Sequence, residues 1–470
     1  MAQALLERDA ELTALAAQLD MARAGRGALA VVEGPAGIGK TSLLAAAAEQ
    51  AGERDMTILR ACGAPLEQSF SFGTARQLLE AVRARCRPAE WRALTAGAAG
   101  LAARALEAPP DDAGPGEDAA HATVHGLFWL TANLATRRPT LVVVDDVHWA
   151  DPPSVRWLGH LARRLDGLPL LLAVAVRAGE PVSDRRLLDD LLDVNAEPPL
   201  RPRPLGRVAA AMVVRAQFAG AADDGFCDAC HAATGGNPFL LRALVASLRA
   251  EGVAPRREMA PTIESFGPEA VARAVVRQLE RLPTGAVELA RAVAVLADGA
   301  PLRRAAALAG LEPPNAARVA DALRSAGLLA PSSALEFVHP IVRAAIYAGL
   351  GPGQRGQWHA RAARVLRGES GEPERVATHL LRTEPSGAID TVAALRAAAQ
   401  AASARGAPET AAVYLRRALD EGPDRGSRSG VLLELGLALA AHAQPGAAEL
   451  LREAAEIATA PAARADAGLR

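Results

Sequence analysis

Membrane-spanning segments, disulfide frameworks and export signals are all missing from this sequence. Its strongest apolar run, LPLLLAVAV at 168–176, is shorter than the roughly 20 residues that a membrane-spanning helix needs. Four cysteines among 470 residues do not form a disulfide framework. The N-terminal stretch MAQALLERDAELTALAAQL at 1–19 indicates a charged amphipathic helix and not a signal peptide. These absences predict a cytoplasmic protein that makes no contact with a membrane.

Aromatic residues, net charge and lysine are scarce as well. Aromatics make up 3% of the chain, and the formal net charge is −1, so no overall basic field attracts the protein to nucleic acid. Ala, Leu, Arg, Gly and Pro dominate instead, as expected of a GC-rich genome, and Ala-Leu-Arg segments favour helices. The length predicts three or four domains, mainly helical outside any sheet. Of the 52 lysine and arginine residues, only Lys40 is a lysine.

This lysine lies in a glycine-rich loop that follows a short apolar run, LAVVE at 29–33. Residues 34–41 read GPAGIGKT, which fits G-x-x-x-x-G-K-[ST], and a helical composition follows, as a P-loop requires. Glycines let backbone N–H groups turn toward phosphate oxygens, and the helix N-terminus adds positive charge. A bulkier, planar guanidinium would not enter such a loop, which explains why this position is not arginine. The residues expected to contact ATP or ADP here are Gly34, Pro35, Ala36, Gly37, Ile38, Gly39, Lys40, Thr41 and Ser42.

A second apolar strand, within TLVVVDDVHWAD at 140–151, ends in two acidic residues. Asp145 is expected to hold Mg²⁺ through water, with the Thr41 hydroxyl as the other protein group at the metal. Asp146 stands where a base that orients the attacking water belongs, and with Lys40 it forms the expected catalytic pair. Because Asp is a shorter base than Glu, the sequence predicts a slow ATPase.

Three further segments complete the expected ATPase domain. The strand LPLLLAVAVRAGE at 168–180 ends in Arg177, which is positioned to sense a γ-phosphate. Residues 105–120 are rich in Pro, Gly and acidic residues and indicate a surface loop. The stretch HATVHGLFWLTANLATRRP at 121–139 predicts a helix that leads into the strand before Asp145.

Taken in order, these motifs resemble the ATPase of the STAND class (signal-transducing ATPases with numerous domains). They resemble more closely the MalT-like large ATP-binding regulators of the LuxR family. The segments that carry the resemblance are LLERDAEL (5–12), the P-loop, VVVDDVHWAD (142–151), ATGGNPFLL (233–241) and FVHPIVRAAIY (337–347). The resemblance implies an α/β P-loop core of the ASCE/AAA-like type, in which the Arg177 strand separates the Asp145 strand from the Lys40 strand. It also implies an all-α lid, a winged helix and an α-helical, tetratricopeptide-like sensor.

The predicted boundaries follow from these parts. The ATPase domain is expected at 1–205, the helical lid at 206–266, the winged helix at 267–350 and an incomplete helical-repeat sensor region at 351–470. Within the winged helix the sequence predicts a hairpin-like segment at 328–339, preceded by helices at about 267–282, 284–297, 301–310 and 314–326.

The resemblance also assigns individual roles outside the P-loop. It implies that Pro238 packs against adenine and that His339 approaches the ADP phosphate in the closed state. Read from the residues alone, Asn237 and Pro238 favour a helix start, with the Asn as N-cap. In the family's N-terminal motif a Gly usually precedes the Arg, whereas here Glu7 precedes Arg8.

Two patterns that suggest other functions have plainer interpretations. Cys227-Asp228-Ala229-Cys230-His231 matches a c-type haem motif, but it lies on a predicted helix in a chain without an export signal. Two buried thiols are therefore expected, with neither haem nor zinc. DNA binding by the winged helix itself has little support, because PPNAARVADALRSAGLLA carries only Arg318 and Arg324.

Beyond 351 a short pattern recurs. Ala411, Ala412, Leu415, Arg416 and Ala418 return 36 residues later as Ala447, Ala448, Leu451, Arg452 and Ala454. Small residues at these positions let antiparallel helices pack closely, as in tetratricopeptide-like arrays. Such an array is expected to bind an inducer or a protein ligand on its concave surface.

The sequence thus predicts an ATP-binding, signal-transducing switch, the ATPase part of a LuxR-family transcriptional regulator that uses ATP/ADP and Mg²⁺. Ligand on the repeats and ATP exchange would favour an open form that self-associates, and DNA would be reached only through a C-terminal domain absent from this sequence. Two alternatives stay open. One is a motor-like AAA+ ATPase acting on DNA or protein, and the other is a regulatory ATPase segment related to that of bacterial adenylate or guanylate cyclases.

Overall fold

A computed structural model of the chain provides the coordinates. It describes residues 5–64, 68–102, 106, 117–177, 184–194, 197–250, 252–259, 263, 279, 282–296, 299–337, 340–368, 373–441 and 444–458. The predicted loop at 105–120 falls largely outside these residues, as do His339, most of the predicted helix at 267–282 and the last 12 residues. No helix in the described part of the chain is both long and apolar enough to cross a membrane.

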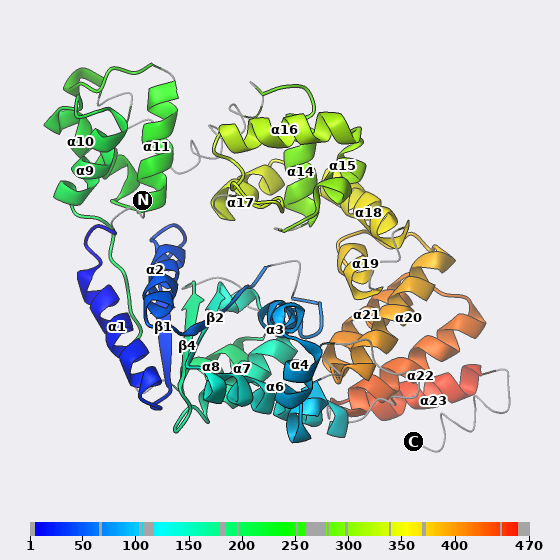
Figure 1. Cartoon of the computed structure of the whole chain (residues 1–470). Helices are drawn as coiled ribbons and strands as arrows, with labels where there is room; N and C mark the ends of the chain where they lie inside the picture. The colour runs from blue at the N-terminus through cyan, green and yellow to red at the C-terminus, as the bar shows by residue number, and fades with distance from the viewer. Residues whose placement is uncertain are drawn as a thin grey trace.

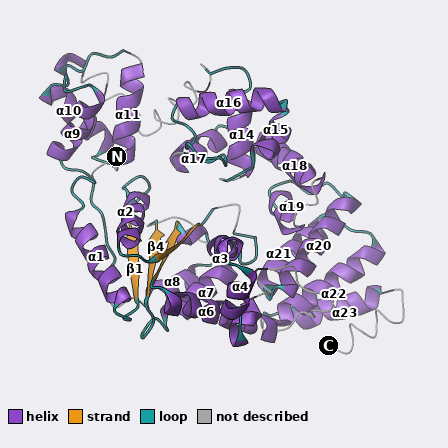
Figure 2. Cartoon of the chain, in the orientation of Figure 1, coloured by secondary structure: helices purple, strands orange, loops and turns teal. Residues whose placement is uncertain are grey.

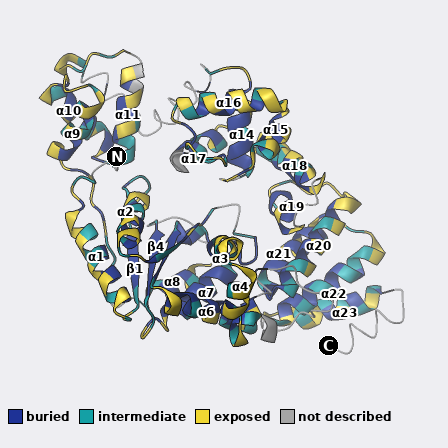
Figure 3. Ribbon diagram, in the orientation of Figure 1, coloured by how far each residue is buried: buried dark blue, intermediate teal, exposed yellow. Residues whose placement is uncertain are grey.

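The N-terminal part is a three-layered α/β unit around four parallel strands (Figure 2). The strands are β1 (Ala28–Glu33), β2 (Thr57–Cys62), β3 (Thr140–Asp145) and β4 (Leu170–Val176), in the spatial order β1-β4-β3-β2. This order confirms that the strand before Arg177 separates the strand before Lys40 from the strand ending at Asp145. Because both faces are covered, β1, β3 and β4 are nearly continuous apolar runs, as in other buried parallel sheets, whereas the edge strand β2 contains the exposed Arg60. Burial along β4 is complete (Figure 3).

Alternate residues of each strand face different helices. Ala30, Val32 and Leu141 pack against the helices α1 (Asp9–Arg23) and α2 (Lys40–Glu53). Leu29, Val31 and Val142 pack on the opposite side. The helices on that side are α3 (Gly73–Arg85), α4 (Pro88–Leu94), α6 (Glu117–Arg137), α7 (Pro152–Ala162) and α8 (Arg185–Leu192), with two 3₁₀ turns, η1 (Gly97–Ala102) and η2 (Val147–Trp149). The helix predicted at 121–139 is confirmed by α6.

The first helix is shorter than the sequence indicated. It begins at Asp9, so the predicted helical path through residues 5–8 is wrong. Glu7 has a φ of 56°, a left-handed conformation that a helix cannot contain. Its carboxylate accepts a hydrogen bond from the Gly206 N–H at 2.7 Å, and Arg8 donates to the backbone oxygen of Ile38 at 3.1 Å. These tertiary contacts hold residues 5–8 over the P-loop and outside the helix.

The segment after the sheet forms a small helical body. It contains α9 (Arg207–Gln217), α10 (Asp224–Thr234), α11 (Pro238–Ala250) and the turn η3 (Arg257–Met259), which share one apolar cluster. Cys227 and Cys230 are buried on α10, and burial raises the pKa of the Cys230 thiol to about 12. No group of three metal-ligating side chains occurs among the described residues. The expected pair of buried thiols on a helix is confirmed.

A third body contains α14 (Ala286–Leu296), α15 (Leu302–Ala309), α16 (Pro313–Ser325) and α17 (Pro340–Ala348). Antiparallel bridges join Leu329 to Phe337 and Ala300 to Leu335, where the sequence indicated a hairpin-like segment. The helices predicted at 284–297, 301–310 and 314–326 are present; the first two are a little shorter than predicted, and the third begins and ends one residue earlier. Since the first predicted helix lies outside the described residues, the winged helix stays a prediction.

The last part is a row of helices in which each element packs against the next. The elements are α18 (Pro352–Gly368), α19 (Pro373–Leu380), α20 (Ile389–Ala404), α21 (Pro408–Asp420), α22 (Arg425–Ala441) and α23 (Ala447–Ile457). The 36-residue pattern holds only in part. Ala411, Ala412, Leu415 and Ala418 are buried, and so are Leu451 and Ala454, but Ala448 is exposed and Ala447 is half-buried. The tetratricopeptide-like character of this row remains a prediction.

The row returns to the α/β part instead of extending away from it. In Figure 1, α21 lies beside α3. Ala407, at the start of α21, is fully buried and belongs to the same apolar cluster as the sheet. Arg156 on α7 pairs with Glu409 at 2.8 Å, and the Thr123 hydroxyl of α6 donates to the Arg405 backbone oxygen at 3.3 Å. The N-terminal α/β part and the C-terminal helices are thereby joined in one folded unit.

Candidate nucleotide-binding site

The groups predicted to act on a nucleotide meet at one edge of the sheet. Lys40 follows β1 through the glycine-rich loop, Asp145 ends β3, and Arg177 follows β4 directly. The strands are parallel and β4 pairs with both β1 and β3. Their carboxyl ends therefore lie together, which is where α/β sheets bind ligands.

The P-loop has the backbone conformation that its glycines permit. Gly37 and Gly39 have φ values of 78° and 107°, which only glycine adopts without strain. A Cβ on Gly37 would also come within 2.8 Å of the Asn237 side chain. The Lys40 ammonium donates to the backbone oxygens of Gly34 at 2.8 Å and Pro35 at 3.0 Å. The lysine is thus held inside the loop, where a phosphate would meet it.

A hydroxyl and a carboxylate lie together beside the loop. The Thr41 hydroxyl donates to Asp145 Oδ2 at 2.6 Å. Burial raises the pKa of Asp145 and the neighbouring Asp146 carboxylate adds to the rise, while the Thr41 hydrogen bond opposes it. A divalent cation between the two groups would favour the charged carboxylate and reverse this effect. The pair has the oxygen ligands and the negative charge that Mg²⁺ prefers.

Asp146 is held by Arg177. The guanidinium donates to both carboxylate oxygens, at 3.1 and 2.8 Å, and the two side chains are only 6% and 10% exposed. The Arg177 guanidinium also stacks over the Trp149 ring at 4.3 Å from its centre. Asp146 itself has a φ of 46°, so its backbone leaves the strand in a left-handed turn. The predicted base and the predicted phosphate sensor are therefore joined in one ion pair.

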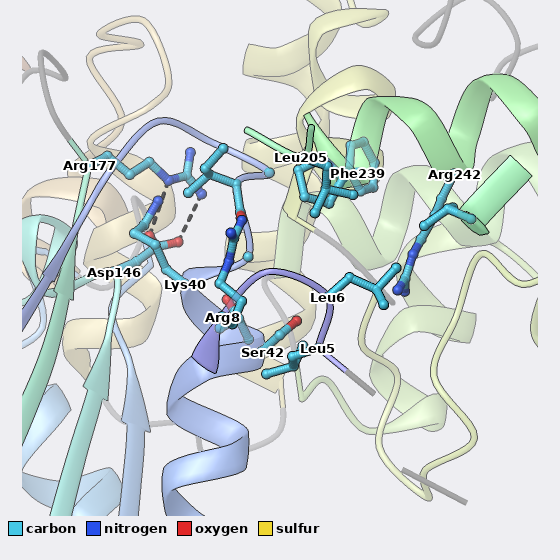
Figure 4. A pocket seen from close by; sticks show the side chains of 16 residues that line it. Leu5, Leu6, Arg8, Lys40, Ser42, Asp146, Arg177, Leu205, Phe239 and Arg242 are labelled. Carbon is cyan, nitrogen blue, oxygen red and sulfur yellow. Dashed lines mark hydrogen bonds and ion pairs between the residues drawn. The ribbon is translucent and has the colours of Figure 1, made fainter. Parts of the chain in front are cut away.

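An apolar wall faces these polar groups, and the sequence analysis identified only one of its members. The wall is formed by Leu5, Leu6, Leu205, Val213, Pro238 and Phe239. Figure 4 shows Leu205 and Phe239 side by side, with Arg242 reaching from α11 toward Leu6. Leu5, Leu6 and Phe239 lie in the segments LLERDAEL and ATGGNPFLL, but only Pro238 was assigned a role there. Leu205 and Val213 belong to no motif. Of the nine P-loop residues predicted to bind nucleotide, Gly37 to Ser42 line the pocket.

The helical body closes this pocket by direct contact with the P-loop. Asn237 caps α11, with its side-chain oxygen accepting from the N–H groups of Phe239 and Leu240 at 3.1 and 3.2 Å. Its amide nitrogen donates to the Ala36 backbone oxygen at 2.9 Å. The predicted N-cap is confirmed, and the same side chain also ties α11 to the phosphate loop. Arg8 makes a second connection, because it donates both to the Ile38 backbone oxygen in the P-loop and, at 2.7 Å, to the Arg203 backbone oxygen in the segment before α9.

Asp151, a buried acid, connects the segment that follows β3 to the loop that follows β2. Asp151 caps α7 and accepts hydrogen bonds from the N–H groups of Phe72 at 2.9 Å, Thr74 at 3.1 Å and Ser154 at 3.0 Å. Burial raises the pKa of Asp151 to about 6, although these hydrogen bonds oppose the shift. Loop 68–72 is thereby fixed to the segment that carries Asp146.

The same loop contacts the C-terminal helices. The Ser71 hydroxyl donates to Glu374 on α19 at 2.6 Å, and the Tyr414 hydroxyl donates to the Ser69 backbone oxygen. Glu374 is fully buried and pairs with Arg405, whose side chain is 6% exposed. A continuous set of polar contacts thus runs from the sheet edge to the helical row. No sequence pattern announced it, because Ser71 and Glu374 are 303 residues apart.

The residues present fit a nucleotide with Mg²⁺. Glycines that no other residue could replace form the loop, a buried ammonium lies within it, and an apolar wall stands opposite. When bound, Mg²⁺ would neutralise phosphate charge beside Thr41 and Asp145. Lys40, Arg177 and Arg242 supply positive charge around the same pocket. The pocket can therefore bind an anionic ligand that carries a flat apolar group.

Comparisons with known proteins agree with this geometry. Residues 4–174 match the family described as AAA ATPase domain. An uncharacterized protein of Rhizobium meliloti (strain 1021) is 26% identical over 452 residues, which cover 88% of this chain and 42% of that protein. The chain therefore spans less than half the length of this curated relative.

Solved structures with a similar path were also found. One is a Signal Transduction ATPase with Numerous Domains (STAND) protein with a tetratricopeptide repeat sensor from Pyrococcus horikoshii. It has a TM-score of 0.49 and 15% identity, over 94% of this chain and 63% of that one. Another is Cdc6p from Pyrobaculum aerophilum, with a TM-score of 0.36 and 14% identity, over 74% of this chain and 94% of that one. The family match, the strand order and the P-loop together show that the N-terminal part is an AAA-type P-loop ATPase domain.

Proposed function

We propose that this protein is a nucleotide-dependent switch in which the ATP or ADP state of the P-loop domain is coupled to the C-terminal helices. The observation that carries the proposal is the buried contact between loop 68–72 and α19. A change at the sheet edge that moved this loop would have to break or shift the Ser71–Glu374 hydrogen bond. Buried polar networks of this kind have few intermediate arrangements, because partly satisfied ones are costly.

Each polar residue around the pocket would have its own role in such a switch. Lys40 would bind the phosphates, Thr41 and Asp145 would hold Mg²⁺, and Asp146 would orient water. Arg177 would exchange the Asp146 carboxylate for a γ-phosphate when ATP is bound. Because Asp is a shorter base than Glu, hydrolysis would be slow.

The finer assignment rests on the sequence motifs. We assign the chain to the ATPase portion of a LuxR-family transcriptional regulator of the MalT-like type. An inducer or protein ligand would act on the helical row, ATP would favour self-association, and DNA would be contacted by a domain outside these residues. A ligand can shift such an equilibrium only by its different affinity for the two states.

Nucleotide binding by the full chain tests the first part of the proposal. In a fluorescence titration with mant-ADP, Lys40→Ala should bind at least about tenfold more weakly, because charge-assisted bonds to phosphate are lost. Lys40→Arg should fail to restore binding, since a guanidinium does not fit the loop. Arg60→Ala removes one positive charge from an exposed position on β2 and should bind like the wild type. Equal affinity in Lys40→Ala and the wild type would refute the assignment.

The release of mant-ADP tests the coupling. Ser71→Ala removes the hydroxyl that Glu374 accepts from, so release should quicken on the order of fivefold. Ser386→Ala is the matched control, because its hydroxyl contacts Glu421 within the helical row, away from the P-loop domain. If both variants release mant-ADP at the wild-type rate, loop 68–72 does not connect the two parts.

A further inference from the structure

A second cleft lies between the ATPase domain and the helical row. Its volume is about 410 Å³, which is within the range of small-molecule sites. The walls come from α6, α7, the start of α21 and the end of α22. None of the residues that line it belongs to the nucleotide pocket.

Basic side chains dominate this cleft. Arg156, His160 and Arg163 follow one another at intervals of four and three residues, so they share one face of α7. His121 joins them from α6. The one acidic residue in the wall is Glu409, and its carboxylate already pairs with Arg156 at 2.8 Å. The described wall therefore carries an excess of positive charge.

Two buried polar atoms in the same wall lack hydrogen-bond partners among the described residues. They are His160 Nε2 and Glu409 Oε2. Buried polar atoms are nearly always paired, and an unpaired one calls for a ligand, an ion or a water. A ring nitrogen that carries hydrogen donates, whereas a carboxylate oxygen accepts. The pair would suit a ligand that has both an acceptor and a donor group.

The surroundings of His160 have the electrostatic character of an anion site. The pKa of His160 is lowered to about 4, first by burial and then by the positive charges of Arg164, His121, His125 and Arg163. The field at this ring is thus positive. An anion placed there would be stabilised by the field and would raise the pKa of the imidazole.

We propose that this cleft binds a small organic anion, a carboxylate or a phosphate monoester that also carries a hydroxyl. Arg163 and His160 bind the anionic group, and the ligand hydroxyl donates to Glu409 Oε2. On the switch function proposed above, this anion is the ligand that the protein senses. The cleft is well placed for that role, because α6 leads into β3 and α7 follows Asp151, so both walls adjoin the strand of Asp145.

Calorimetric titration of the full chain with glycerol 3-phosphate, glycerate and glycerol tests the site. Saturating Mg-ADP is present throughout, so that the P-loop cannot bind the probe. At least one of the two anions should bind, and the neutral glycerol should not. His160→Gln and Arg163→Gln should each weaken anion binding at least about tenfold, the value of a lost charge-assisted hydrogen bond. Arg85→Gln, an exposed arginine on α3 outside the cleft, should bind like the wild type.

The outcomes separate this proposal from the switch itself. Binding of neither anion, or equal binding by His160→Gln and the wild type, would overturn the cleft assignment while leaving nucleotide binding untouched. Lys40→Ala should keep its anion affinity even though it loses mant-ADP. The bound anion should also change the rate of mant-ADP release, and an unchanged rate would overturn the sensing role alone. Phosphate and carboxylate ligands are distinguished by which of the two probes binds more tightly.

Discussion

Replacing Asp146 by Asn should make the protein bind ATP more tightly while it hydrolyses ATP more slowly. In the structure both oxygens of this carboxylate accept from Arg177, at 3.1 and 2.8 Å, within a nearly buried ion pair. On the proposed function, Arg177 must leave Asp146 to reach a γ-phosphate. The carboxylate therefore competes with ATP for the guanidinium.

The size of the effect follows from the number of hydrogen bonds that Arg177 can make. Asp146 accepts two from the guanidinium, whereas Asn keeps one acceptor oxygen. The donor is charged in both proteins, and a hydrogen bond to a charged group contributes about 1.5–3 kcal/mol, so the competition weakens by about 1.5–3 kcal/mol. That corresponds to about 10- to 150-fold tighter ATP binding. The affinity for ADP should change little, because ADP has no γ-phosphate, and hydrolysis should fall by about 10²–10⁴ when the base is lost.

Isothermal calorimetry with ATP and with ADP measures both affinities in wild type and Asp146→Asn. Asp189→Asn is a suitable control, because it neutralises an exposed carboxylate that pairs with Arg185 at 3.0 Å on α8. Exposed pairs contribute about 0–1 kcal/mol, and this pair lies outside the pocket, so ATP affinity should not change. An Asp146→Asn protein whose ATP affinity stays level or falls relative to ADP would refute the competition.

Two further predictions concern the junction of the ATPase domain with the helical row. Glu374→Leu should destabilise the protein by about 3–5 kcal/mol, because Arg405 stays buried without its carboxylate, and Glu374→Leu with Arg405→Leu should recover much of the loss. Calorimetric melting should show a drop in Tm of about 6–20 °C for the single variant, and a double variant that melts no higher than the single one would contradict this account. The Asp151 pKa, raised by burial to about 6, means that this group contributes stability at low pH that is lost as the pH rises through 6. The wild type should therefore exceed Asp151→Asn in stability by about 1.4 kcal/mol more at pH 5 than at pH 7.5, as measured by Tm at the two pH values, and a constant difference would exclude the raised pKa.

Local patterns in the sequence were enough to predict which groups meet at one edge of the sheet. The P-loop around Lys40, the strand ending at Asp145 and the strand before Arg177 each have their own composition. The resemblance to STAND ATPases supplied the strand order, which the parallel pairing of β4 with β1 and β3 confirms. The roles assigned to single residues in nucleotide binding remain predictions, and His339 lies outside the described residues.

The features that the sequence did not reveal depend on contacts between distant segments. Helical periodicity extended the first helix through Glu7, but the Gly206 N–H draws this side chain away and gives it a positive φ. A glycine at this position would adopt such a φ without strain. The pairing of Asp146 with Arg177 and the burial of Glu374 involve charged residues that, read alone, indicate a solvated surface.

The burial of Ala407 within the sheet's own apolar cluster limits how this protein can be divided. A gene fragment that ended after β4 would expose to water the apolar surface that Ala407, just before α21, covers in the full chain. Such a fragment would have an exposed apolar patch beside α6 and α7, and exposed apolar patches favour aggregation. Recombination that exchanges sensors between relatives would succeed only when the receiving ATPase domain has a complementary apolar surface. The two parts are therefore expected to be inherited together.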